Sequence, residues 1–80
     1  ILSAAIAGAW RVPMANHLYS DVGAHMLRVT ETAHWLEWVN WGDPLLQEPY
    51  VMKDGMLHIP DRPGLGLEWD EDAVAAHLVT

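Results

Sequence analysis

Two apolar runs separated by a short helical pattern dominate the first half of the chain. Trp10 to Asn16 forms the first run, which Pro13 interrupts, and Ala33 to Val39 forms the second. Between them, Ser20 to Arg28 has apolar residues at helical spacing. Continuous apolar runs are typical of parallel strands buried on both faces. The order strand, crossover helix, strand therefore predicts a right-handed parallel unit, although a proline by itself favours an edge or bulged strand.

The rest of the chain predicts two further helices, a hairpin and loops. Residues 1–9 have the pattern of a helix end that stops near Gly8. In the second half, WGDP predicts a turn, YVMKDGMLHI a hairpin closed by Asp54-Gly55, and PDRPGLG a rigid loop. Side-chain caps are expected at the start of the crossover helix and of the last helix, from Ser20 or Asp21 and from Asp70.

A histidine and a glutamate mark the same place on the two predicted strands. His17 directly follows the first run in VPMANHLYS, and Glu37 interrupts the second in HWLEWVNW. In a parallel unit both residues fall at or near the carboxyl ends of adjacent strands, which form the functional face of α/β sheets and barrels. The structural alternatives are a histidine satisfied by backbone groups and a glutamate in an ordinary buried salt bridge.

Composition and charge narrow the classes of function. The chain is 51% hydrophobic and 19% charged, with a net charge of −7 that argues against a nucleic-acid-binding surface. The absence of cysteine excludes disulfides and thiolate metal sites, and the histidine spacing fits no zinc motif. ILSAAIAGAW is about half of the roughly 20 residues that a membrane-spanning helix needs. A cytoplasmic protein without a membrane segment is the resulting expectation.

The expected parallel unit is too small to be stable alone. Two strands cannot shield their own edges, and small domains without disulfides or metals usually need other support. The chain also begins in the middle of a helical pattern. We therefore expect a piece of a larger protein.

Two long segments resemble a known family. HLYSDVGAHMLRVTETAHWLEW and LQEPYVMKDGMLHIPDRPGLGLEWDEDAV resemble the C-terminal end of mandelate racemase and its relatives in the enolase superfamily. The similarity runs over nearly the whole chain. Its most specific parts are the 20-residue interval from His17 to Glu37, the TAHWLE string and IPDRPGLG.

The resemblance implies an α/β fold, namely the C-terminal portion of a (β/α)8-type, or modified TIM, barrel. Residues 1–40 would be the end of the barrel: the end of helix 6, strand 7, helix 7 and strand 8. VPMANH would be strand 7 and AHWLEWV strand 8. Residues 41–80 would form a hairpin, loop and helix that return to a capping domain.

The resemblance also implies the chemistry. The family abstracts the proton next to a carboxylate, with Mg²⁺ stabilising the enediolate. His17 matches the family's histidine base, and Glu37 matches the glutamate that hydrogen-bonds a substrate carboxylate oxygen. Asn16 stands where the mandelate racemase pattern has a serine. The metal-binding carboxylates, a lysine base and an aspartate that orients the histidine would all precede Ile1.

Two hypotheses of function follow. In the first, the chain is part of a Mg²⁺-dependent enzyme that racemises or dehydrates a 2-hydroxy acid or acid sugar. Its partners would be the carboxylate substrate, the remaining barrel and capping domain, and further copies in a homo-oligomer. In the second, the chain is a non-catalytic structural fragment or barrel relic that only packs against other polypeptide.

Overall fold

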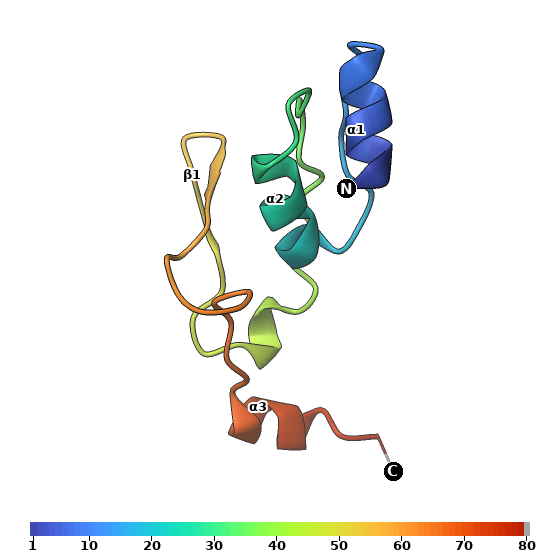
Figure 1. Ribbon diagram of the computed structural model, residues 1–80. Helices are drawn as coiled ribbons and strands as arrows, with labels where there is room; N and C mark the ends of the chain where they lie inside the picture. Colours follow the sequence, from blue (N-terminus) through green and yellow to red (C-terminus); the bar gives the residue numbers. More distant parts are fainter. Residues whose placement is uncertain (80) are drawn as a thin grey trace. The chain divides into compact units, whose positions relative to one another are not determined.

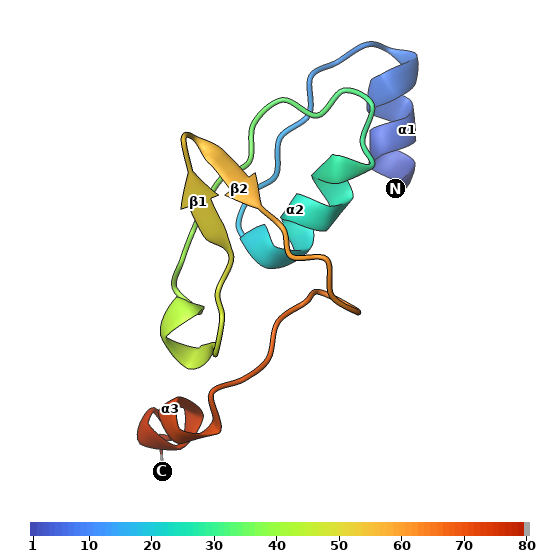
Figure 2. The same cartoon turned by 90° about the vertical axis from the view of Figure 1, so that its left-hand side faces the viewer.

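The computed structural model describes residues 1–79, which belong to two compact units, Ile1–Val39 and Asn40–Thr80. In the first unit, two helices lie side by side (Figures 1 and 2). The second unit contains a short 3-10 helix, a two-stranded hairpin and a last helix. The elements, in chain order, are α1 (Leu2–Ala9), α2 (Ser20–Arg28), η1 (Asp43–Leu45), β1 (Val51–Lys53), β2 (Met56–His58) and α3 (Glu71–Ala76).

Both helices of the first unit lie where the apolar spacing predicts them. The chain leaves α1 through Arg11, which has a φ of 52°. The predicted cap of α2 is wrong, because the N-cap is Tyr19, with a φ of 46° and no side-chain cap bond. The hydroxyl of Ser20 instead bonds to the backbone of Glu37 and Val39. The Ser20 hydroxyl therefore bonds to residues 37 and 39 and does not cap its own helix.

The two predicted strands prove to be much shorter than expected. They meet at one isolated parallel bridge between Met14 and Ala33, where the Met14 N–H donates to the Thr32 carbonyl and the Met14 carbonyl accepts from His34. The parallel direction is confirmed, but the expectation of full strands over Trp10–Asn16 and Ala33–Val39 is wrong. Pro13 has no N–H to donate, and beyond the bridge side-chain hydrogen bonds replace the backbone ladder.

The hairpin of the second unit confirms the sequence prediction. β1 and β2 pair antiparallel, with Met52 opposite Leu57 in the middle of the register. Asp54 and Gly55 both have positive φ, 52° and 72°, as a two-residue primed turn requires. Of the predicted WGDP turn, Trp41 and Gly42 form a turn, and Asp43 and Pro44 are the first two residues of η1.

The loop and last helix also follow their sequence signals. Residues 60–66 contain no regular structure, and Arg62 forms an ion pair of 2.6 Å with Glu48 before this loop. The nearly buried Tyr50 donates its hydroxyl to the carbonyl of Leu65. Asp70 caps α3, since its Oδ1 accepts from the Ala73 N–H at 3.0 Å.

The described residues bury little apolar surface. Ala24 and Tyr50 are 5% exposed, whereas Trp10, Trp35 and Trp41 are each more than two-thirds exposed. The most buried side chain is a polar one, Ser20, at 2%. No helix within residues 1–79 is long and apolar enough to cross a membrane.

The hairpin turn can be tested with two glycines that both face open space. An added Cβ at Gly55 or at Gly42 would meet no atom within 4 Å, but Gly55 has a φ of +72° and Gly42 one of −84°. We expect Gly55→Ala to lower the free energy of unfolding by about 1–2 kcal/mol through left-handed strain. Gly42→Ala is the control, and urea unfolding should show a change near zero or a small gain. Equal effects of the two variants would contradict the assigned turn.

Candidate functional site

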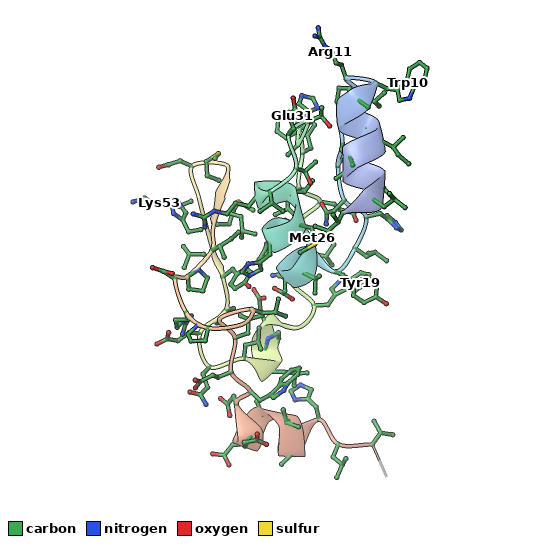
Figure 3. All side chains as sticks on the ribbon, viewed as in Figure 1. Trp10, Arg11, Tyr19, Met26, Glu31 and Lys53 are labelled. Atoms are coloured by element: carbon green, nitrogen blue, oxygen red, sulfur yellow. The ribbon has the colours of Figure 1, made fainter. Side chains whose placement is uncertain are left out.

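His17 stands at a sharp change of chain direction. The two residues after it, Leu18 and Tyr19, both have left-handed backbone conformations, with φ of 55° and 46°. The Tyr19 carbonyl then accepts from the N–H groups of Val22 and Gly23 in the first turn of α2. Figure 3 shows the Tyr19 side chain pointing away from this helix. Because the turn is so tight, the helix begins three residues after His17.

Glu37 is fixed to this turn through its backbone and its side chain. Its carboxylate Oε2 accepts the N–H of Leu18 at 2.5 Å, directly after His17. Its own N–H donates to Asn16 Oδ1 at 2.6 Å, and its carbonyl accepts from Ser20 Oγ at 2.8 Å. The three contacts orient the carboxylate beside the turn.

Ser20 and Asn16 complete the connection. Ser20 Oγ also accepts the N–H of Val39 at 2.9 Å, so that one buried hydroxyl joins two backbone groups of the second segment. Asn16 Nδ2 donates to the Leu18 carbonyl at 3.0 Å. The side chains of Asn16 and Ser20 thus form hydrogen bonds to residues 37–39 in place of the backbone hydrogen bonds that a longer strand would have formed.

The structure therefore brings the two predicted site residues to one place. Within residues 1–79, their side chains make no hydrogen bond to each other, and both are exposed. The imidazole of His17 forms no hydrogen bond with this part of the chain, and Glu37 forms no ion pair there. Neither structural alternative, a backbone-satisfied histidine or a buried salt bridge, is seen among these residues. The catalytic roles of His17 and Glu37 remain predictions.

A separate hollow of about 350 Å³ lies between α1 and α2. Ala4, Ala5, Asn16 and Met26 are among its lining residues, whereas His17 and Glu37 are not. The hollow is mostly apolar and is lined by neither of the two predicted site residues. The candidate site is the exposed surface at the His17 turn.

The described residues do not fit a magnesium ion. They contain no group of three or more histidine or acidic side chains that could hold a metal. At the candidate site, one carboxylate oxygen of Glu37 already accepts a backbone N–H. We therefore assign no metal-binding role to residues 1–79.

Three residues of this arrangement lie outside the predicted site. In the sequence, Asn16 stands out only by its departure from the family pattern, and Ser20 has the pattern of a helix cap. Gly23 lies inside α2, where an added Cβ would be 2.7 Å from Asn16 Nδ2. A glycine within a helical pattern is unfavourable by about 1 kcal/mol, which is the one signal of this close approach available from the sequence.

Comparison with protein families identifies the class. A sequence model of the family described as "Enolase C-terminal domain-like" matches residues 2–73. The chain belongs to this family, whose fold is of the TIM-barrel type, and the resemblance to the enolase superfamily is thereby confirmed.

Curated relatives include two acid-sugar dehydratases. The chain is 33% identical over 83 residues to D-xylonate dehydratase of Haloferax volcanii, covering 92% of this chain and 20% of that protein. It is 35% identical over 60 residues to L-talarate/galactarate dehydratase of Salmonella typhimurium, covering 75% and 15%. The chain thus spans about a fifth or less of the length of these relatives.

Solved structures with a similar backbone include two proteins described as enolases. One, from alpha proteobacterium BAL199 with bound magnesium, is 68% identical with a TM-score of 0.91, covering 96% of this chain and 21% of that chain. The other, from Bradyrhizobium, is complexed with magnesium and mandelic acid. It is 42% identical with a TM-score of 0.86, covering 98% and 21%.

The connection through Ser20 gives a test of how the site is held. Ser20→Ala leaves the Val39 N–H and the Glu37 carbonyl without this partner, so we expect the free energy of unfolding to fall by about 1–3 kcal/mol. The control is Ser3→Ala, an exposed serine in α1, which should change stability by less than about 0.5 kcal/mol. Urea unfolding of the full-length protein measures both. A Ser20 variant as stable as the control would refute this role of the hydroxyl.

Proposed function

We propose that this chain is the C-terminal part of an acid-sugar dehydratase that acts through an enediolate. The observation that carries the proposal is the hydrogen bond from the Leu18 N–H to the Glu37 carboxylate, which brings a carboxyl group next to His17. The relatedness to D-xylonate and L-talarate/galactarate dehydratases supports the reaction class. In this proposal, residues 1–40 are the end of the barrel and residues 41–80 contribute to a capping domain.

His17 is the proton carrier in the proposed reaction. Its neutral imidazole accepts the proton next to the substrate carboxylate, and the electron pair of that C–H bond forms the C=C bond of the enediolate. The enediolate then returns to a carboxylate: the electron pair of its C=C bond forms a new C=C bond to the neighbouring carbon as the bond from that carbon to its hydroxyl oxygen breaks. The imidazolium gives its proton to the leaving hydroxyl group, which departs as water. Histidine suits both transfers because its charge changes near neutral pH.

Glu37 is proposed to stabilise the charge that builds up on the substrate carboxylate. In the protonated form it donates a hydrogen bond to a carboxylate oxygen of the substrate, and this bond strengthens as the enediolate forms. Oε2 is held by the Leu18 N–H, and Oε1 makes no hydrogen bond within residues 1–79. This second oxygen is therefore the one available for the substrate.

Groups outside residues 1–79 are needed to complete the site. The magnesium in the neighbouring structures supports a Mg²⁺-dependent enzyme, in which the ion would stabilise the enediolate charge. Its ligands would come from the rest of the barrel. A homo-oligomer, expected from the family, is part of the same proposal.

Racemisation of a 2-hydroxy acid is the second candidate, favoured by the mandelic acid bound in the Bradyrhizobium structure. Racemisation needs a base on each face of the substrate carbon, whereas the dehydration proposed above can use His17 on one face. Incubation of the full-length protein in D₂O with Mg²⁺ and xylonate, galactarate, mannonate or mandelate separates the two. Loss of water identifies a dehydratase, and deuterium incorporation with inversion identifies a racemase. If none of these acids undergoes either reaction, the result would favour the non-catalytic fragment.

The role of His17 can be tested by removing its proton-carrying nitrogen. We expect His17→Asn in the full-length protein to lower kcat by about 10²- to 10⁴-fold, the usual contribution of a general acid–base residue. His58→Asn, an exposed histidine of β2, is the matched control and should keep wild-type turnover. Unchanged kcat in the His17 variant would remove this residue from the mechanism.

The role of Glu37 can be tested by a change that keeps its shape. Glu37→Gln retains an oxygen for the Leu18 N–H but offers the substrate a much weaker acid. We therefore expect kcat to fall by about 10²- to 10³-fold, as for the loss of a hydrogen-bond donor to a developing oxyanion. Glu48→Gln, whose carboxylate pairs with Arg62, is the control for loss of an acidic charge. A fall in affinity alone, with kcat retained, would contradict the role.

A further inference from the structure

We propose that Asn16 is a positioning residue that sets the place of the Glu37 carboxylate, and that Gly23 is required to leave space for it. The proposal rests on the proposed function for its catalytic consequence, but its structural part stands on contacts alone. It assigns a task to two residues that do not themselves touch the substrate in the proposed mechanism.

The amide of Asn16 holds both partners of the bond that orients the carboxylate. Oδ1 accepts the Glu37 N–H at 2.6 Å, and Nδ2 donates to the Leu18 carbonyl at 3.0 Å. Nδ2 also lies 3.5 Å from the Glu37 carbonyl oxygen. Leu18 is the residue whose N–H binds the Glu37 carboxylate. One side chain thus fixes the donor and the acceptor of that hydrogen bond relative to each other.

Gly23 lies directly against the side chain of Asn16. A Cβ at Gly23 would lie 2.7 Å from Nδ2, 3.1 Å from Cγ and 3.2 Å from Cβ of Asn16. These atoms include the root of the side chain, so the clash cannot be relieved by moving only its tip. The asparagine would have to turn away and release the backbone groups that it holds.

Space, not backbone conformation, explains this glycine. Gly23 is an interior residue of α2, and it is not among the glycines with positive φ. Alanine is the better helix former, and an unconstrained helical position would favour it. The asparagine side chain packed against Gly23 is the physical reason that alanine does not fit there.

The first experiment compares Asn16→Ala with Glu37→Gln and with the double variant in the full-length protein. Because a displacement of about 1 Å at a reacting group can cost roughly 100-fold, we expect Asn16→Ala to lower kcat by about 10- to 100-fold with little change in KM. In the Glu37→Gln background the same change should cost far less, since Asn16 acts through that carboxyl group. Equal losses in the two backgrounds would overturn the positioning role.

The second experiment tests the space that Gly23 provides. Gly23→Ala should lower kcat as Asn16→Ala does, and the double variant Gly23→Ala/Asn16→Ser should recover part of the loss, because serine is shorter and can still accept a hydrogen bond. Gly8→Ala is the matched control in α1, where a Cβ would meet only the tip of Glu31 at 3.3 Å, and it should keep wild-type activity. No loss in Gly23→Ala, or no recovery in the double variant, would overturn the proposal.

A measurement without substrate separates this proposal from the proposed function. Hydrogen–deuterium exchange at the Glu37 N–H should accelerate by roughly tenfold in Asn16→Ala and in Gly23→Ala, and stay at the wild-type rate in Gly8→Ala. If the wild-type protein transforms no acid but exchange accelerates, the proposed function fails and the structural claim stands. If activity is present and exchange is unchanged, the positioning claim fails.

Discussion

The hydrogen bonds between Glu37 and residues 16–20 determine how the two halves of the candidate site meet. The N–H, the carbonyl and one carboxylate oxygen of Glu37 each bond to a different residue of that segment. Backbone pairing between the two segments is limited to the bridge from Met14 to Ala33. Side-chain chemistry therefore performs the task that a sheet ladder performs in longer strands, and the position of the carboxylate depends on the few residues that supply those side chains.

At Ser20, a local interaction competes with a tertiary one: the hydroxyl can cap a helix or bond to residues 37 and 39. Serine is a favoured helix cap, but the N-cap position of α2 is Tyr19, and the Ser20 hydroxyl bonds to the backbone of residues 37 and 39. A cap and a buried bridge are of similar size, about 1 kcal/mol each, so local preference does not decide the outcome. Conflicts of this kind are expected near functional sites, where the helix gives up a local contact so that another group is held in place.

Features that depend on neighbouring residues can be predicted from this sequence, whereas features that depend on contacts between distant residues cannot. The limits of α2, the Asp54-Gly55 hairpin and the Asp70 cap depend on neighbouring residues, and the structure confirms them. The strands are shorter than the apolar runs predict, because such a run does not reveal where side chains replace the backbone ladder. A parallel unit predicts that residues 17 and 37 lie near each other. It does not predict the hydrogen bond from the Glu37 N–H to Asn16, which joins residues distant in sequence. Nor does it predict that a side chain at Gly23 would clash with Asn16.

The pair of left-handed residues after His17 has a consequence for how such a protein can diversify. Leu18 and Tyr19 reverse the chain so tightly that no spare residue remains between the histidine and α2. Deleting a residue would pull the helix out of register with His17, and an insertion would separate the Leu18 N–H from the Glu37 carboxylate. Variation in length, the usual way in which loops acquire new specificities, is thus closed to this connection. Within residues 1–79, change at this connection is therefore limited to point substitutions that keep its length.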